Sequence, residues 1–313
     1  ARRDRWAAAV ACVATLDALV ALATASSQPN FARATLVEAH GAAEQRLVMR
    51  DGAHPCLEAL LGKRSAARDA PGVDVVGNDV ALDAASGRVL LLSGPNMGGK
   101  STLLRSVCVS AVLAQCGCFV RASSFELTPA DRIFTRLGAA DKIMEGQSTF
   151  MVELVETATI LNEATDRSLC ILDELGRGTA TFDGAAIAHA VVHDLARKIR
   201  CRALFATHYH DLVKEWQHEA GVQAGFMDCL VEDDGQTVVF LYKLVAGISP
   251  RSFGINVARL ARLPASVIDE AIEKSREFED DLEARLRANA AEAAAASQEA
   301  GPTPDEPTAA PSS

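Results

Sequence analysis

The sequence predicts an α/β fold with a mostly parallel sheet flanked by helices. Two continuous apolar runs, at residues 88–94 and 201–207, are typical of strands buried on both faces of a sheet. Apolar residues recur at helical spacing in residues 149–165 and 182–199, which lie between these two runs. A chain that alternates strands and helices in this way covers a parallel sheet with helices. Its 313 residues suit one large domain with additional elements.

The first 92 residues predict one helix and several short strands. Residues 5–24 are rich in alanine and apolar all round, which predicts a buried helix. Residues 26–34 are typical of a loop. Short strands are predicted within residues 35–39, 46–49 and 73–76.

The rest of the chain continues the alternation and ends in a tail. A helix is predicted from Lys100 to Gln115, and a proline at 264 separates two helices near the C-terminus. The last residues, GPTPDEPTAAPSS, have the composition of a disordered segment. Further strands are predicted at residues 131–136, 168–172, 222–231 and 237–245, and the C-terminal helices at 252–262 and 264–287.

The formal charge of −10 is concentrated in the C-terminal tail. Residues 269–313 hold twelve acidic and four basic side chains, whereas residues 1–268 hold 29 acidic and 27 basic ones. The near-neutral body therefore lacks the basic surface of a stand-alone nucleic-acid binder. The eight cysteines form no CxxC pair and no zinc spacing. They predict reduced, buried thiols in a cytosolic or nuclear protein.

The N-terminal segment imitates a secretory signal peptide, because basic residues precede an apolar run that ends in small residues. Asp17 lies inside this run, where a membrane would penalise it by about 2.5–3.5 kcal/mol. The chain also begins with Ala1 rather than Met. We interpret the segment as the end of a longer helix, and expect a protein that is neither secreted nor bound to a membrane.

The stretch SGPNMGGKSTLLRS, residues 93–106, follows the first apolar run. It matches the motif GxxxxGK[ST] from Gly94 to Ser101. Glycines let backbone N–H groups turn toward phosphate oxygens, and the helix that follows adds its positive end. Lys100 should reach the β- and γ-phosphates of a nucleotide, and the Ser101 hydroxyl should bind Mg²⁺. The predicted phosphate-binding residues are Gly94, Pro95, Asn96, Met97, Gly98, Gly99, Lys100, Ser101 and Thr102.

Two acidic residues and a histidine follow other predicted strands. Asp173, at the end of LCILDE, is placed to hold Mg²⁺, and Glu174 to polarise an attacking water molecule. His208 follows the strand at 201–207. Carboxyl ends of parallel strands meet at one edge of a sheet, so we expect these residues beside the phosphate loop. There His208 can sense the γ-phosphate and orient water. Taken alone, solvated acids and a structural histidine would explain the same residues.

Two other patterns have a weaker link to chemistry. GRGTATFDG, residues 176–184, is too rich in Gly, Arg, Thr and Asp to build a core. It predicts a loop at a subunit interface beside the nucleotide, or else a long turn. His189 and His193 lie four residues apart, which resembles metal-ligand spacing. No third ligand accompanies them, so we interpret them as helix surface or packing.

Together these elements resemble the MutS family of DNA mismatch-repair ATPases. The segments that carry the resemblance are GPNMGGKST, GQSTFMVELVETATILNEAT, DELGRGTATFDG and FATHYHDL. Asn96 and Met97 inside the loop are typical of that family and unusual elsewhere. The resemblance runs from Trp6 to Phe278. Within the family it is strongest to the eukaryotic mismatch-recognising subunit of the MutSα heterodimer.

The resemblance implies a P-loop NTPase fold of the ABC-ATPase type, with ATP and Mg²⁺ enclosed between two domains paired head to tail. Ser148 and Thr149 would then cap the γ-phosphate bound by the partner, acting in trans. The GRGTATFDG loop would contact the partner at the same interface. Adenine would lie near Val75, Asn78 and Tyr242. The family usually has an aromatic residue where Val75 stands, so weaker stacking is expected on that side.

The resemblance also implies a domain order. Arg251, Arg259 and Arg262 leave a DNA-reading helix-turn-helix open, but the near-neutral body favours dimerisation for that element. The implied regions are the end of a lever helix at 1–25, an ABC-type ATPase domain at 26–248, a helix-turn-helix dimerisation element at 249–287 and a disordered tail at 288–313.

The expected function is an ATP-binding and hydrolysing module of a MutS-type protein, in which ATP drives the conformational switch of a DNA clamp. The expected partner is a second MutS-type subunit, as a heterodimer. Mismatched DNA would be bound by the full-length complex rather than specifically by this fragment. The location would be nuclear in a eukaryote and cytoplasmic in a bacterium. Two alternatives stay open: a transporter-type ATPase, which would show LSGGQ where STFMVEL stands, and a non-catalytic truncated dimerisation or regulatory module.

Overall fold

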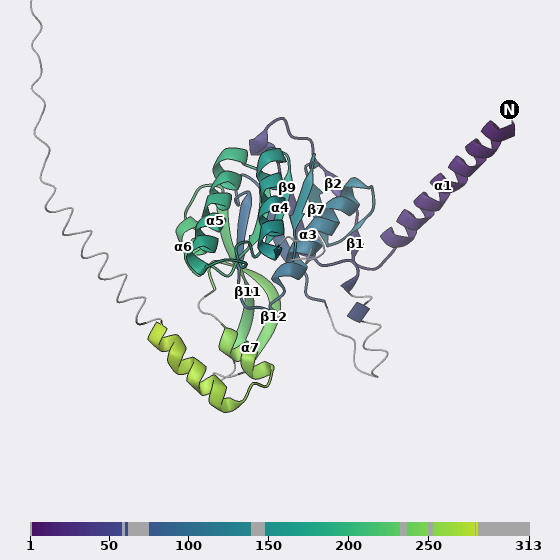
Figure 1. Cartoon of the computed structure of the whole chain (residues 1–313). Coiled ribbons are helices and arrows are strands. Elements are labelled where there is room, and N and C mark those ends of the chain that lie inside the picture. Colours follow the sequence, from purple (N-terminus) through teal and green to yellow (C-terminus); the bar gives the residue numbers. More distant parts are fainter. Residues whose placement is uncertain are drawn as a thin grey trace, which may run out of the picture. The chain divides into compact units, whose positions relative to one another are not determined.

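The computed structural model describes residues 2–57, 60–61, 75–138, 148–231, 237–249, 253–278 and 280 (Figure 1). The chain divides into two compact units, residues 1–253 and residues 254–313. The first unit combines β-sheets with covering helices, so the predicted α/β class is confirmed.

A six-stranded sheet forms the centre of the first unit. Its strands pair in parallel from β11 through β5, β10 and β9 to β8, while β12 pairs antiparallel with β11. Strands β5, β9 and β10 are buried along their whole length, as their continuous apolar sequences predict. In spatial order the strands are β12 (Val238–Ala246), β11 (Val222–Val231), β5 (Val89–Ser93), β10 (Arg202–Ala206), β9 (Leu169–Asp173) and β8 (Ile133–Arg136).

A second sheet of four strands packs against the first, and part of it was not predicted. The strands β6 and β7 are absent from the sequence prediction, because residues 120–127 contain serines and no long apolar run. The second sheet contains β2 (Thr35–Leu36), β7 (Ser124–Leu127), β3 (Leu47–Gly52) and β4 (Asn78–Leu82), and a separate pair contains β1 (Phe31–Ala32) and β6 (Val120–Arg121).

The strand predicted at 73–76 is wrong for the two residues that the structure describes, Val75 and Val76. Strand β4 begins only at Asn78, which pairs with Gly52 at the end of β3. Because β3 ends there, no described strand lies beside the two valines to complete backbone hydrogen bonds. The predicted loop at 26–34 likewise contains the short strand β1.

Helices cover both faces of the central sheet. The helix α3 spans Lys100–Gln115, as predicted. The helix predicted at 182–199 is α-helical only over α5 (Thr181–His193) and continues as a π-helix over Asp194–Ile199. Other helical elements of this unit include a short 3-10 turn at Ala42–Glu44, α4 (Thr149–Glu163) and α6 (His210–Trp216), the last of which was not predicted.

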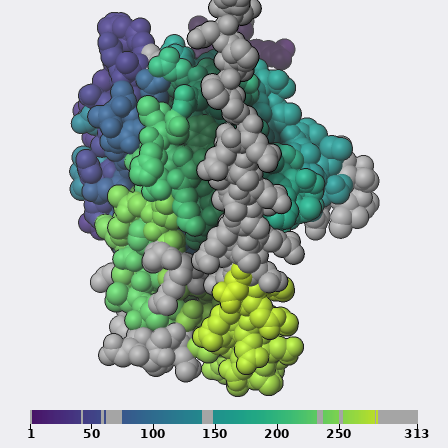
Figure 2. Space-filling view, turned by 90° about the vertical axis from the view of Figure 1, so that its left-hand side faces the viewer, coloured from purple at the N-terminus to yellow at the C-terminus, as the bar shows by residue number. Residues whose placement is uncertain are grey.

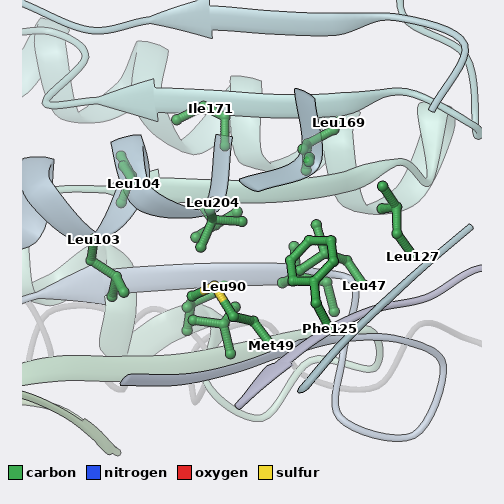
Figure 3. Packing of buried hydrophobic residues seen from close by; sticks show 14 of the residues in the cluster. Leu47, Met49, Leu90, Leu103, Leu104, Phe125, Leu127, Leu169, Ile171 and Leu204 are labelled. Atoms are coloured by element: carbon green, nitrogen blue, oxygen red, sulfur yellow. The ribbon is translucent and has the colours of Figure 1, made fainter. Parts of the chain in front are cut away.

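Side chains of the buried strands point alternately into two apolar cores, one on each face of the central sheet. Leu90 and Leu204 point with α3 and the second sheet into one core, which Figure 3 shows. Leu91 and Phe205 point into the other, under α5 and α6. Segments far apart in the sequence therefore share one body, and blue and green side chains lie next to one another in Figure 2. This packing fixes the carboxyl edge of the central sheet.

The N-terminal helix α1 spans Arg2–Ser26, so a helix is correct here but its predicted burial is wrong. None of its residues is buried, and Trp6 is 71% exposed. No other described element packs over its apolar side chains. The helix α1 is long and apolar enough to cross a membrane by length and composition alone. Core helices of soluble proteins and signal sequences meet the same criterion.

The second unit contains two described helices. Helix α7 spans Gly254–Leu260, and residues 265–278 form another helix after Pro264. The predicted pair of helices is therefore present up to residue 278. Residues 281–313, with the predicted disordered tail, lie outside the described part, as does Arg251.

The cysteines match their predicted burial only in part. Cys118, Cys170 and Cys201 are buried free thiols. Three others, Cys12, Cys56 and Cys116, are exposed. The exposed cysteines lie on α1, before Leu57 and at the end of α3, outside the apolar cores.

Candidate nucleotide-binding site

Three neighbouring strands deliver the predicted site to one edge of the central sheet. In the register, Ala206 of β10 pairs with Leu92 of β5 on one side and with Asp173 of β9 on the other. The Glu174 N–H donates to the Ala206 carbonyl at 2.9 Å. The phosphate loop, the Asp173-Glu174 pair and the segment that begins at Thr207 therefore leave the sheet side by side.

The glycine-rich loop turns sharply into helix α3. Gly99 caps the helix with a φ of 100°, which L side chains rarely adopt. A Cβ atom on Gly99 would also lie 3.3 Å from the Tyr242 ring. Met97 has a positive φ of 72° and is 69% exposed. The loop thus opens backbone N–H groups ahead of the helix, which is the geometry that binds anions.

Lys100 lies in the first turn of α3 and is buried. Its Nζ donates to the Gly94 carbonyl at 2.8 Å and to the Pro95 carbonyl at 3.2 Å, and lies 3.8 Å from Glu174 Oε1. Burial lowers the pKa of Lys100, while the charges of Glu174 and Asp173 oppose that shift. The ammonium is therefore held inside the loop that it would use to bind phosphate.

Asp173 and Glu174 differ in their surroundings. Asp173 is buried, and its Oδ1 has no hydrogen-bond partner among the residues that the structure describes. A buried carboxylate oxygen without a partner is costly unless a cation binds it. Glu174 has a φ of 58°, a strained value for a residue other than glycine. Its Oε2 accepts from Arg177 at 2.5 Å, so both carboxylate oxygens face cations.

His208 follows β10 but is exposed and is not among the described residues that line the cavity. Its ring centroid lies 4.2 Å from that of Tyr209. Desolvation first, and then the charges of Arg177, Lys100 and His210, lower its pKa. A neutral imidazole is therefore favoured at this edge of the sheet, next to the cavity rather than within its wall.

A cavity of about 590 Å³ opens beside the loop, a size suited to a nucleotide. Val75, Asn78 and Tyr242, which the resemblance assigns to the adenine side, line this cavity. The Asn78 amide is occupied, because Nδ2 donates to the Tyr242 carbonyl at 2.9 Å and Oδ1 accepts from Leu244 N–H at 2.6 Å. Asn78 therefore anchors β12, and Tyr242, which is 48% exposed, offers an aromatic ring. Of the predicted loop residues, Pro95, Asn96, Met97, Gly99, Lys100, Ser101 and Thr102 line this cavity, whereas Gly94 and Gly98 do not.

Sequence reasoning missed one wall of this cavity. Residues 52–61 contribute Gly52, Ala53, His54, Leu57 and Leu61 to its lining. Leu57 and Leu61 are four residues apart, a helical spacing that could have indicated a common face. The pairing of β3 with β4 and β7 brings this segment to the cavity that the loop also lines. Desolvation and Arg105 lower the pKa of His54, so this wall is neutral as well as apolar.

Ser148 and Thr149 do not reach this cavity. Ser148 is the N-cap of α4, and its Oγ accepts from the Met151 N–H at 3.2 Å. Thr149 begins the helix. Neither is among the described lining residues.

His189 and His193 pack against a neighbouring aromatic ring, as predicted. His189 Nε2 lies 3.0 Å from Glu215, and His193 Nδ1 lies 3.3 Å from Asp194. Both rings contact Trp216. Within the described residues no group of three or more His, Cys, Asp or Glu side chains could hold a metal ion.

Comparison with known proteins identifies the family of this chain. The family model MutS domain V matches residues 90–279. The chain is 46% identical to DNA mismatch repair protein Msh6 of Homo sapiens over 288 residues, which cover 88% of this chain and 20% of that protein. It is 44% identical to Msh6 of Gallus gallus over 287 residues, with 88% and 21% covered.

A bacterial relative matches at a similar level. DNA mismatch repair protein MutS of Symbiobacterium thermophilum is 45% identical over 261 residues, which cover 83% of this chain and 28% of that protein. The chain spans between a fifth and three tenths of the length of these three relatives. It therefore belongs to the MutS family of DNA mismatch-repair proteins and is similar to the eukaryotic Msh6 members.

Proposed function

We propose that this chain is the ATP-binding and hydrolysing module of a MutS-type DNA mismatch-repair protein, with a P-loop fold of the ABC-ATPase type. The observation that supports this most strongly is the meeting of Lys100, Asp173 and Glu174 at one edge of the sheet, beside a nucleotide-sized cavity. Phosphoryl transfer requires positioned positive charge and an oriented water molecule rather than covalent chemistry. These three side chains supply both.

The residues fit a magnesium ion. Asp173 presents a buried oxygen to which no described group donates, and Ser101 lines the cavity beside it. Asp173 and Ser101 would hold Mg²⁺, which when bound neutralises charge on the β- and γ-phosphates. Hard oxygen ligands of this kind suit magnesium better than softer metals.

The other roles follow from position and charge. Lys100 would exchange its loop carbonyls for phosphate oxygens, since a triphosphate offers it negative charge. Glu174 would accept a hydrogen bond from the attacking water and align it with the γ-phosphate. His208, favoured in its neutral form, would sense the γ-phosphate from the end of β10.

A second MutS-type subunit would complete the site, giving a heterodimer. Ser148 and Thr149 lie away from this chain's own cavity, which fits a role on the partner's nucleotide. The loop at 176–184 would contact the partner, and its Phe182 is 84% exposed. Residues 249–287 would serve dimerisation, and residues 1–25 would end a lever helix. ATP would drive the switch of a clamp on mismatched DNA in the whole nuclear complex.

On the adenine side, we expect Val75→Phe to strengthen ATP binding about fivefold, because a second aromatic face would complete the stack with Tyr242. Base stacking on an aromatic side chain contributes about 1–3 kcal/mol, and the lower end gives this factor. Calorimetric titration with ATP·Mg²⁺ measures the change. Tripolyphosphate, which has no base, should show no gain. Equal gains for both ligands would reject stacking as the cause.

The proposed function is tested with the purified chain and the ATPase region of a second MutS-type subunit. We expect binding of ATP·Mg²⁺ and its hydrolysis to ADP. If ATP·Mg²⁺ binds but is not hydrolysed in the presence of the partner, the chain is not a hydrolase. If ATP·Mg²⁺ neither binds nor is hydrolysed, the non-catalytic alternative is favoured. A transporter-type ATPase is disfavoured because STFMVEL stands where LSGGQ would be required.

A further inference from the structure

A buried glutamate on α4 connects that helix to the loop that follows the two acidic site residues. Glu153 is 4% exposed and lies one turn into α4. Its Oε1 accepts from the Gly176 N–H at 2.5 Å, and its Oε2 pairs with Arg136 at 3.1 Å. Arg136 is buried too, so the pair is held at low dielectric, where removal of either partner has a large effect.

Gly176 is held from its other side as well. The Tyr209 hydroxyl donates to the Gly176 carbonyl at 3.0 Å. Gly176 has a φ of 95°, and a Cβ atom there would lie 2.7 Å from the Gly184 carbonyl oxygen. Its peptide is therefore clamped on both its N–H and C=O sides, two residues after Glu174. Since Glu174 itself has a positive φ, its strained backbone needs such restraint from neighbours.

A second contact joins the same two segments. A Cβ atom on Gly178 would lie 2.6 Å from Phe150 Cβ, so the first turn of α4 packs directly on the loop after Glu174. Any displacement of α4 would reach this loop through Phe150 and through the Glu153 carboxylate. Ser148, which the proposed function assigns to the partner's nucleotide, lies at the start of the same helix.

The geometry points to Glu153 as a positioning residue that holds Glu174 in its reactive place and ties it to α4. This inference rests on the proposed ATPase function, because it assigns Glu153 a share in how Glu174 is aligned. Glu153 touches neither the cavity nor Lys100, so it should act on the rate of hydrolysis and leave ATP affinity nearly unchanged.

The test compares Glu153→Gln with Glu156→Gln in the full chain, with the ATPase region of a second MutS-type subunit. Glu156 is on the same helix and lies 3.5 Å from the same Arg136, but its side chain is 46% exposed. We expect Glu153→Gln to lower kcat about tenfold or more with less than a twofold change in ATP Kd. Glu156→Gln should change neither. A kcat within twofold of wild type, or equal losses in kcat and affinity, would overturn the proposal.

A second variant and a second measurement keep the test decisive. Tyr209→Phe removes the other hydrogen bond to Gly176 with loss of one oxygen atom, and it should lower kcat in the same way. This variant provides the test if Glu153→Gln does not fold. Amide hydrogen exchange over residues 172–178, without nucleotide, should be faster in Glu153→Gln than in Glu156→Gln. If the wild-type chain hydrolyses no ATP, the proposed function fails. The exchange rates then decide separately: faster exchange supports positioning by Glu153, and unchanged exchange overturns it.

Discussion

Glu174→Gln should lower the rate of ATP hydrolysis by about 100-fold or more and leave ATP binding intact. The amide keeps the size of the side chain but cannot accept a proton or align water as a carboxylate does, and such a group contributes about 10²–10⁴-fold. Glutamine also keeps an oxygen for Arg177, which now lies 2.5 Å from the carboxylate. The measurements are steady-state hydrolysis and the ATP Kd.

Glu163→Gln is the matched control for this substitution. Glu163 pairs with Arg132 at 2.6 Å, and its side chain is 54% exposed at the far end of α4. It should hydrolyse ATP at the wild-type rate. If Glu174→Gln also hydrolyses at that rate, Glu174 does not orient the water and another group must do so.

Lys100→Met should weaken ATP binding about 100-fold. The buried ammonium is the positive charge that the loop can offer to the β- and γ-phosphates, and charge-assisted hydrogen bonds contribute about 1.5–3 kcal/mol each. Methionine keeps the unbranched stem and fills the same space without the charge. Calorimetric titration with ATP·Mg²⁺ gives the affinity.

The control for Lys100 is Lys214→Met, on α6. Lys214 pairs with Asp211 at 3.2 Å and is 63% exposed, outside the described cavity lining. It should bind ATP as the wild type does. Equal affinity in Lys100→Met and wild type would show that phosphate is not bound by this loop.

Much of the site could be predicted because it depends on local sequence. Asp173 ends an apolar strand and Glu174 follows it, and parallel strands end at one edge, so their meeting with the loop required no knowledge of distant contacts. His208 comes two residues after β10 at the same edge but is not among the described lining residues of the cavity. The helix from Lys100 to Gln115 could also be predicted from local sequence, because it begins directly after the glycine-rich turn.

What was missed depends on contacts between distant segments. The cavity wall at residues 52–61 faces the loop only because β3 pairs with β4 and β7. The burial of Glu153 requires Arg136, seventeen positions earlier, and the N–H of Gly176. A glutamate in a helix is usually exposed to solvent, so its sequence alone predicts an exposed side chain. The ion pair with Arg136 allows Glu153 to be buried instead. The apolar α1 predicted burial, yet nothing described in this chain covers it.

Single-turnover hydrolysis of ATP bound to this chain tests most directly whether its cavity is half of a composite site. The ATPase region of a second MutS-type subunit, with its own phosphate-loop lysine replaced, is titrated in, so that only ATP on this chain can turn over. We expect ATP to bind without the second subunit and the hydrolysis rate to rise about tenfold or more to saturation. The proposal would be contradicted if the isolated chain already hydrolysed ATP at the maximal rate. That rate would then depend neither on the concentration of the chain nor on added second subunit.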